Sequence, residues 1–486
     1  MMSSIYFIAL PLLFGFSVPI LSKFGKNGVA YTSLILQLSL FLLSITLVLD
    51  LTTPIVEVIA ISPPLGIALV SDNVSMFFVT IFTFFTLVLS IYYMGQRENK
   101  KYANENKFFI LLNMLLASAI GLVLSSDIFN IYVFFEIAGI SSYILSSYEK
   151  TANALEAGLK YLLTGAMASI FLVFGIFLIY LHLGTLNLAL ISQNFYTLSI
   201  ELQLLIATLL FVGFGFKVEV FPFNLWVSDI YEGSTPLVNA LFSSIVSKAY
   251  LFVFFHLLYL FIPHHNFTDF LLSVGVISMI LAEIVAIKQT NIKRVFAYSS
   301  LGQLGLLFIA FSMQTSDAII AGLYILLAHS IAKMVIFLSL DSIINKYKSE
   351  DISVLEKMNS PFMKWILLIS MLSLLGIPLF AGFVGKFLIL KTFGIAGYFG
   401  IISAIILASL IEAIYYFKLI GLMFKNTEKG DYMEISILQK SVLLLLTISI
   451  LFIGVYPFIL SDWINLASET MINSHTYQNI ILGVQL

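Results

Sequence analysis

Apolar runs separated by short polar breaks recur along nearly the whole chain. Each run approaches the roughly 20 apolar residues that an α-helix needs to cross a bilayer. The runs lie at residues 6–21, 29–49, 77–93, 108–124, 128–148, 159–183, 204–226, 237–261, 270–287, 295–311, 319–340, 365–393, 400–424 and 442–460. No polar stretch between them is long enough for a soluble domain. The pattern predicts an all-α polytopic membrane protein of about 14 transmembrane helices, in one domain over residues 1–486.

The composition supports a location in lipid. Of the 486 residues, 60% are hydrophobic and 10% are charged, whereas a soluble protein carries about a quarter charged residues. The chain has no cysteine for an iron–sulfur cluster, and its six histidines show no metal-ligand spacing such as HExxH. We therefore expect no cofactor in this chain. The net charge of −2 argues against nucleic acid as a partner.

The basic residues suggest an orientation. They gather after the first, third, fifth, ninth, eleventh and thirteenth runs. Short cytoplasmic loops collect Lys and Arg, so these loops are expected inside and both termini outside the cytoplasmic membrane. Two exceptions stand out. Lys391 lies in the twelfth run, and the loop after the seventh holds Asp229 and Glu232 without a basic residue.

Two runs contain helix-breaking residues. The seventh reads GFGFKVEVFPFNLW with Pro222, and the twelfth reads LLGIPLFAGFVGKF with Gly376, Pro378 and Gly382. Proline removes a backbone donor and disrupts the preceding turn. Interrupted helices at matching places in two halves of a membrane protein indicate internal repeats with an ion or substrate site between them. The simpler alternative is a packing kink.

Four ionisable residues lie inside apolar runs: Glu136, Lys217, Lys248 and Lys386. A charge at the centre of a bilayer costs about 3 kcal/mol on insertion scales, so each must face protein or water. Three lysines against one glutamate leave amines without anionic partners. A desolvated lysine of that kind can gain and lose a proton near neutral pH. The pattern favours a proton path, and the alternative is an ion pair that only holds helices together.

A further pair extends this path. His329 and Lys333, in LLAHSIAKMVIFL, are four residues apart and share one helix face. They are expected to lead towards Lys386. The alternatives are a packing histidine and a lysine that reaches an interface.

Other ionisable residues receive lesser roles. Glu283 is expected to pair with either half of the chain, and Glu412 and Lys418 to lie near a membrane interface. Loop or helix-end positions are expected for His182, Glu219 and His256.

Several stretches together resemble a known family. They are SSDIFNIYVFFEIAGISSYIL, ALEAGLKYLLTGAMAS, GFGFKVEVFPFNLWVSDIYEGSTPLVNALFSSIVSKAY, NIKRVFAYSSLGQLG, LLAHSIAKMVIFL and GIPLFAGFVGKFLIL. The chain resembles the antiporter-like proton-translocating subunits of complex I, Mrp cation/proton antiporters and membrane-bound hydrogenases. Among these, the stretch DIFNIYVFFEI looks closest to the D subunit of Mrp antiporters and its relatives in energy-converting hydrogenases. The resemblance implies 14 helices with two inverted five-helix repeats, near 108–261 and 270–424, in which helices 7 and 12 are broken.

The resemblance also implies roles for particular residues. Glu136 looks like the glutamate that pairs with the lysine of the seventh helix, here Lys217. Lys248 looks like a bridging lysine and Lys386 like the terminal lysine of the twelfth helix. Between them, His329 looks like the link in the eleventh helix.

These features predict a proton-translocating subunit with no catalytic centre of its own. Other membrane subunits of a redox-driven pump or an Mrp-type antiporter are the expected partners, and sodium is a possible second cation. Two alternatives remain open: a structural scaffold with ion pairs that do not titrate, and a stand-alone cation/proton exchanger.

Overall fold

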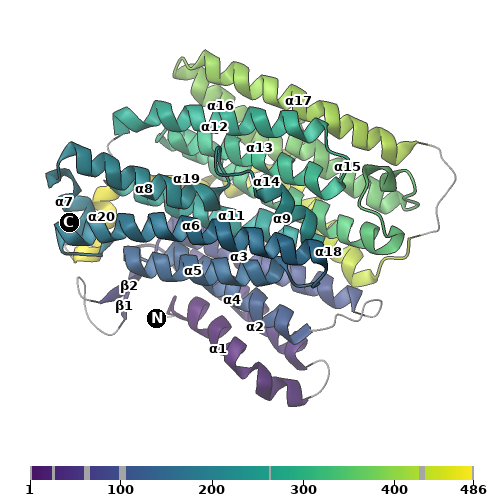
Figure 1. Cartoon of the computed structure of the whole chain (residues 1–486), viewed down its shortest axis with the longest axis horizontal. Coiled ribbons are helices and arrows are strands. Elements are labelled where there is room, and N and C mark those ends of the chain that lie inside the picture. The colour runs from purple at the N-terminus through teal and green to yellow at the C-terminus, as the bar shows by residue number, and fades with distance from the viewer. Residues whose placement is uncertain are drawn as a thin grey trace.

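Long helices running in roughly the same direction make up almost the whole molecule (Figure 1). The computed structural model describes residues 3–24, 28–59, 66–97, 105–261, 264–425 and 433–483. Parts of the predicted basic loops lie outside these residues. The first helices are α1 (Tyr6–Leu21), α2 (Gly28–Asp50), α3 (Asn73–Gln96), α4 (Glu105–Leu124), α5 (Ile128–Ser146), α6 (Ala152–Leu183), α7 (Leu188–Asn194), α8 (Ile200–Val218), α9 (Val227–Gly233) and α10 (Pro236–Leu241).

The remaining helices complete the bundle. They are α11 (Ser247–Phe261), α12 (His264–Ile287), α13 (Ile292–Ser312), α14 (Ser316–Tyr347), α15 (Pro361–Leu375), α16 (Ala381–Ile395), α17 (Phe399–Phe424), α18 (Ile437–Val455), α19 (Ser461–Ile472) and α20 (Ser474–Leu482). Among the described residues, 12 helical segments are long and apolar enough to cross a membrane, and α1 and α15 are shorter apolar helices. The prediction of a multi-pass α-helical membrane protein is confirmed.

Short elements cover one end of the bundle. A hairpin of β1 (Ile55–Ile59) and β2 (Ile67–Ser71) pairs antiparallel, with Ile55 opposite Ser71. The sequence pattern did not predict this hairpin. α1 begins and α20 ends near this end, so the two terminal helices open and close the chain on the same side of the bundle (Figure 1).

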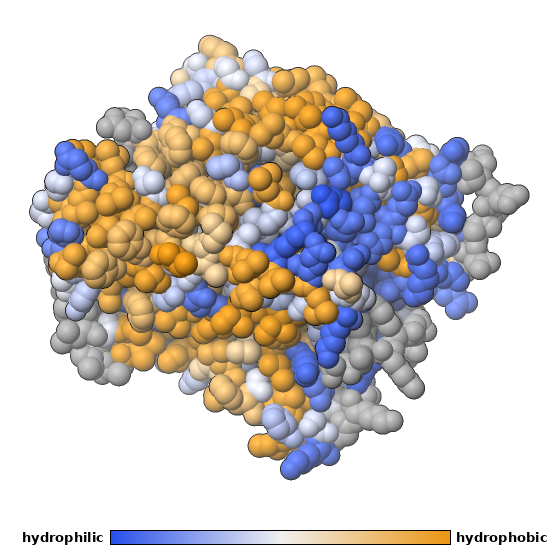
Figure 2. Space-filling view, in the orientation of Figure 1, coloured by the Kyte–Doolittle hydropathy of each residue, from blue (hydrophilic) through white to orange (hydrophobic). Residues whose placement is uncertain are grey.

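Burial separates central helices from peripheral ones. We call the continuous helical segment Pro236–Phe261 the α10–α11 rod. Its apolar segment is 100% buried and that of α14 is 89% buried, whereas those of α2 and α17 are only 28% buried. Large apolar side chains cover much of the outer surface in Figure 2, as expected where hydrocarbon is the solvent. The polar residues that carry chemistry are therefore found inside the bundle, around its central helices.

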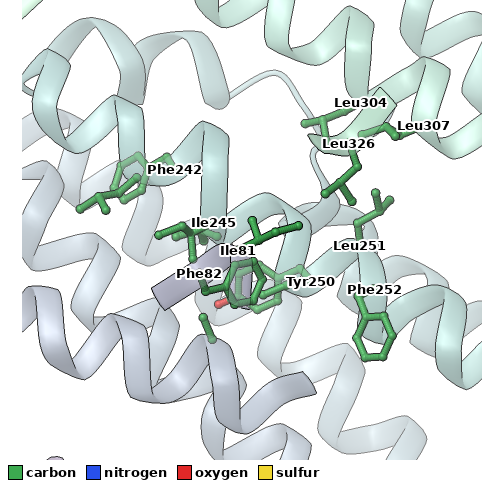
Figure 3. Close-up of a cluster of buried hydrophobic side chains, with 14 of the residues drawn as sticks. Ile81, Phe82, Phe242, Ile245, Tyr250, Leu251, Phe252, Leu304, Leu307 and Leu326 are labelled. Carbon is green, nitrogen blue, oxygen red and sulfur yellow. The ribbon is translucent and has the colours of Figure 1, made fainter. Parts of the chain in front are cut away.

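An apolar core surrounds the α10–α11 rod. Figure 3 shows side chains from α3, α11, α13 and α14 in this region, among them Phe82, Tyr250, Leu304 and Leu326. Each of these four is at most 1% exposed. Tyr250 also belongs to the site described below, so the apolar core directly supports that site.

Both helix interruptions lie where the sequence predicts them. α8 ends at Val218, and Glu219 after it takes the left-handed conformation, with φ of 64°. α15 ends at Leu375, where Gly376 has φ of 79°, and α16 begins only at Ala381. A third irregularity was not predicted: residues 242–246 form a π-helical turn between α10 and α11. Such turns are frequent at functional sites.

Candidate functional site

An aromatic cage surrounds the buried amine of Lys217, in the last turn of α8. Its Nζ atom donates a hydrogen bond to the Tyr143 hydroxyl at 2.7 Å. It also lies 4.6 Å from the Tyr143 ring centroid, 4.9 Å from that of Tyr161, 5.4 Å from that of Phe135 and 5.6 Å from that of Tyr250. Aromatic faces attract a cation without carrying a charge of their own. The cage can hold an ammonium ion without a direct ion pair.

Two glycines make room for this arrangement. A Cβ atom at Gly165 would lie 1.7 Å from the Tyr143 hydroxyl oxygen and 3.1 Å from Lys217 Nζ. A Cβ at Gly139 would lie 2.8 Å and 3.2 Å from the same two atoms. The hydrogen bond between Tyr143 and Lys217 therefore depends on the absence of side chains at these two places in α5 and α6.

Glu136 lies near this cage without bonding to the lysine. It is only partly buried on α5, and its Oε1 atom has no hydrogen-bond partner among the described residues. Lys217 feels its charge, yet no carboxylate oxygen of the described residues lies within 4 Å of the Lys217 amine. The expected pairing of Glu136 with Lys217 is thus an interaction at a distance, because the aromatic rings occupy the space around the amine.

Glu219 is a buried member of the site for which the sequence predicts only a helix-end role. It caps the interrupted end of α8, is 4% exposed, and leaves Oε2 without a hydrogen-bond partner among the described residues. It interacts electrostatically with both Lys217 and Lys248. The signal was present in FKVEVF, where the glutamate follows the lysine by two residues in an apolar run.

Lys248 lies at the π-helical turn and is fully buried. Its Nζ atom donates to the Ser243 carbonyl oxygen and, at 3.2 Å, to the Ser247 hydroxyl. The π turn brings that carbonyl into reach of the amine five residues later. We call Glu136, Lys217, Glu219 and Lys248 the first-half cluster.

His329 and Lys333 continue the row on α14. His329 is 1% exposed, neither ring nitrogen has a hydrogen-bond partner among the described residues, and the ring interacts electrostatically with Lys248 and Lys333. Lys333 donates to the Phe296 carbonyl at 2.9 Å and to the Ser299 hydroxyl at 2.6 Å. It is fully buried, so the alternative in which Lys333 reaches an interface is wrong.

Lys386 is held by an ion pair that the sequence did not predict. Its Nζ atom lies 2.9 Å from Glu412 Oε2, and it donates to the Leu375 carbonyl at 3.2 Å. That carbonyl belongs to the last turn of α15, where the helix break frees it. Glu412 is 2% exposed and accepts a second hydrogen bond from Gln303 at 2.9 Å. The expectation that Glu412 lies near an interface is wrong, although Lys418, further along α17, is exposed.

Glu283 completes the acidic side of this region. It is 2% exposed on α12 and accepts a hydrogen bond from the Tyr415 hydroxyl at 2.7 Å. We call Glu283, Lys333, Lys386 and Glu412 the second-half cluster. With Glu219, Glu283 and Glu412 inside the protein, the predicted excess of buried lysines over carboxylates is wrong. Folding brings together carboxylates that are far from the lysines in sequence.

Two small cavities adjoin Lys386. One, of about 10 Å³, is lined by His329, Gln303 and Ser373 among others. The second, also about 10 Å³, is lined by Glu283, Gln303 and Glu412. A polar cavity of this size holds about one water molecule. Each cavity therefore has room for a single water between ionisable groups.

His182 and His256 take no part in this row. His182 is exposed at the end of α6. His256 is 8% exposed within α11 and stacks on Phe252, so its expected place in a loop or at a helix end is wrong.

A network of partly exposed ion pairs lies at the polar end of the bundle. Asp229 on α9 is 2.7 Å from Lys160 and 2.8 Å from Arg294, and Arg294 is 2.6 Å from Glu232. Figure 2 shows a polar region over the part of the bundle where Figure 1 labels α9, and the network lines a surface pocket of about 290 Å³. Partial burial raises the pKa of Asp229, but hydrogen bonds from Lys160 and Arg294 outweigh it and hold the pKa below its usual value.

Comparisons with known proteins agree with this architecture. The family described as NADH:quinone oxidoreductase/Mrp antiporter, transmembrane, matches residues 125–412. NADH-quinone oxidoreductase subunit N of Flavobacterium johnsoniae is 30% identical over 408 residues, covering 80% of this chain and 87% of that protein. F(420)H(2) dehydrogenase subunit N of Methanosarcina mazei is 29% identical over 409 residues, covering 79% and 81%.

Solved structures extend the likeness over nearly the whole chain. A chain of the membrane-bound sulfane sulfur reductase, an archaeal respiratory membrane complex, superposes with a TM-score of 0.90 at 30% identity, over 99% of this chain and 100% of that chain. A chain of the Mrp complex from Dietzia sp. DQ12-45-1b has a TM-score of 0.89 at 19% identity, over 99% and 100%, and so shares the fold. The matched residues include both helix interruptions. The chain belongs to the NADH:quinone oxidoreductase/Mrp antiporter transmembrane family.

Proposed function

We propose that this chain is a proton-translocating subunit of a multi-subunit membrane complex. The observation that carries the proposal is a row of ionisable side chains, buried except for the partly buried Glu136, that runs through both clusters. Its members are Glu136, Lys217, Lys248, His329, Lys333 and Lys386, from α5, α8, α11, α14 and α16. Buried charges are costly in a membrane protein and mark ion or proton paths.

The proposed mechanism is electrostatic. Neighbouring ionisable groups in a low-dielectric interior change each other's proton affinity strongly. A charge change near Glu136 would alter the proton affinity of Lys217. The effect would then pass to Glu219 and Lys248, and through His329 to Lys386. Water in the small cavities beside Lys386 would connect groups that do not touch. The driving reaction would take place in partner subunits, so this chain would need no cofactor and no catalytic centre.

The names of similar proteins support the type of complex that we propose for this chain. The F. johnsoniae relative is named as a subunit of NADH-quinone oxidoreductase, and the archaeal structure is titled a respiratory membrane complex. We propose that this chain likewise lies in the cytoplasmic membrane with other membrane subunits, its termini outside. We also propose 14 spans with two inverted repeats near 108–261 and 270–424. Transport measurements with and without sodium test whether this cation accompanies the protons.

The decisive experiment measures proton pumping by the assembled complex in vesicles. Lys217→Ala and Glu136→Ala should each abolish pumping, while Lys440→Ala, at an exposed position of α18, should leave it intact. Full pumping by both first-half variants would reject the proposal. Reconstitution of the chain alone tests the stand-alone exchanger, which would exchange cations for protons without partners.

One observation favours the scaffold alternative. The ion pair between Lys386 and Glu412 joins α16 to α17 and would hold these helices together without moving protons. If the row is only structural, the double variant Glu136→Leu with Lys217→Met should retain coupled activity, because well-packed apolar residues often replace buried charges without loss of stability.

A further inference from the structure

The second-half cluster contains two buried carboxylates in very different surroundings. Glu412 bonds the ammonium of Lys386 at 2.9 Å and accepts from the Gln303 amide at 2.9 Å. Glu283 accepts only from the Tyr415 hydroxyl at 2.7 Å, and no cationic atom of the described residues lies within 4 Å of it. The environment of Glu412 stabilises a negative charge, and that of Glu283 does not.

The groups around Glu283 come from four helices. Glu412, Tyr415 and Tyr416 face it from α17, Lys386 from α16 and Lys333 from α14; the neighbouring helix α13 contributes the uncharged Gly302. Both lysines act from a distance, because Lys386 bonds Glu412, and Lys333 bonds Phe296 and Ser299. The nearby charge of Glu412 repels a second negative charge. Two carboxyl groups whose surroundings differ in this way divide into one charged and one neutral partner.

The carboxyl group of Glu283 is tightly packed against the neighbouring helix α13. A Cβ atom at Gly302 would lie 1.9 Å from Glu283 Oε1, so this carboxyl group packs directly against the backbone of α13. The same carboxyl lines the cavity of about 10 Å³ that Lys386 and Glu412 also line. One water molecule in that cavity would connect the carboxyl of Glu283 with the ion pair.

From this juxtaposition we propose that Glu283 holds a proton at neutral pH and exchanges it with the Lys386–Glu412 pair, as a further proton-carrying residue of the path. In the exchange, an N–H bond of the Lys386 ammonium breaks and an O–H bond forms on the Glu412 carboxylate, which leaves a neutral amine and a neutral acid. The O–H bond of the Glu283 acid then breaks, and its proton passes through the cavity water to the neutral Lys386 amine. This leaves a Glu283 carboxylate and restores the Lys386 ammonium beside the neutral Glu412. This inference rests on the proposed function for its transport step, but the protonation of Glu283 does not.

Infrared difference spectroscopy of the purified complex tests the protonation. A protonated carboxyl group has a C=O stretch that a carboxylate lacks, and H/D exchange shifts it. Glu283→Gln should lose one such band at neutral pH. Glu412→Gln should also lose it, because Glu283 then becomes the partner of the Lys386 ammonium. Glu201→Gln, at an exposed position in the first turn of α8, is the matched control and should keep the band.

Proton pumping is measured on the same preparations. Loss of the band together with slowed pumping in Glu283→Gln, and partial recovery of both in Glu283→Asp, supports the inference. An unchanged band in Glu283→Gln overturns it, and so does loss of the band with full pumping. If the unmodified complex does not pump at all, the proposed function fails, and the band alone then decides whether Glu283 is protonated.

Tyr415→Phe gives an independent measurement in case Glu283→Gln does not assemble. It removes the only hydrogen bond that stabilises the Glu283 carboxylate among the described residues. The pH at which the band disappears should rise by about one unit, which is the effect of a hydrogen bond to a charged group. No change in that pH would show that the band does not come from Glu283.

Discussion

The two clusters hold the lysines of their broken helices in opposite ways. Lys217 lies among four aromatic rings and one hydroxyl, with no carboxylate of the described residues within 4 Å. Lys386 lies 2.9 Å from the buried carboxylate of Glu412. When Lys217 loses a proton, a neutral amine remains among neutral rings. When Lys386 loses a proton, either the Glu412 carboxylate is left without its cation or the proton moves to Glu412. A lysine beside each of two helix breaks thus meets two different electrostatic conditions.

The largest effect should come from exchanging each lysine for methionine. Lys386→Met leaves the buried Glu412 without its cation, and breaking a buried pair in this way costs about 3–5 kcal/mol. Lys217→Met leaves no directly bonded carboxylate behind and places an apolar chain among the rings, so it should cost much less. Thermal unfolding of the assembled complex measures both. Equal losses for the two variants would contradict the comparison.

An exposed pair provides the control for this experiment. Lys425 and Glu356 lie 3.1 Å apart, with 58% of the Lys425 side chain exposed. Exposed ion pairs contribute about 0–1 kcal/mol, so Lys425→Met should change the unfolding temperature little.

A smaller effect should follow from filling the space beside the aromatic cage. Gly165→Ala places a methyl group 1.7 Å from the present position of the Tyr143 hydroxyl, so the ring must move away from Lys217. Overpacking of this kind costs about 1–3 kcal/mol. Unfolding of the complex measures the loss, and pumping should fall with it, since the Lys217 amine loses its only hydrogen bond among the described residues.

Two further variants test whether the clash with the Tyr143 hydroxyl, and not alanine in place of glycine in general, causes the loss of stability. Gly421→Ala, on the outer face of α17, meets nothing within 4 Å and should not destabilise the protein. In a Tyr143→Phe background, Gly165→Ala should cost less, because the hydroxyl that it would strike is gone. A cost that is the same in both backgrounds would mean that Tyr143 is not the cause.

The smallest effect concerns the partly exposed network of Asp229, Lys160, Arg294 and Glu232 at the polar end, which contrasts with the two clusters inside the bundle. The pKa of Asp229 is lowered in the folded protein, against the opposing effect of its partial burial, by hydrogen bonds from Lys160 and Arg294. Its contribution to stability is therefore present above the unfolded value of about 3.9 and is lost as the pH falls through the lower folded value. Asp229→Asn should lower the unfolding temperature slightly at pH 7, and the difference from the unmodified protein should shrink on acidification. A difference that grows as the pH falls would contradict this sign.

Local patterns along the chain were enough to predict several parts of the protein. Apolar runs long enough for a bilayer predicted the spans, because the backbone in lipid must satisfy its own hydrogen bonds within helices. Proline and glycine predicted the breaks at Pro222 and Gly376. Lys217, Lys248 and Lys386 could be singled out because a charged residue in an apolar run is costly to place in lipid.

The pairing of distant side chains, in contrast, depends on how the helices pack. Glu412 is 26 residues from Lys386 and Glu283 is 132 residues from Tyr415, and helix packing brings each pair within hydrogen-bonding distance. The rings around Lys217 likewise come from three other helices. Two ionisable groups pair only when they lie within a few ångströms of each other in the folded protein. The order of residues along the chain does not give that distance. For this reason the sequence predicted correctly that Lys217, Lys248 and Lys386 are buried, but it misjudged the carboxylates that accompany them.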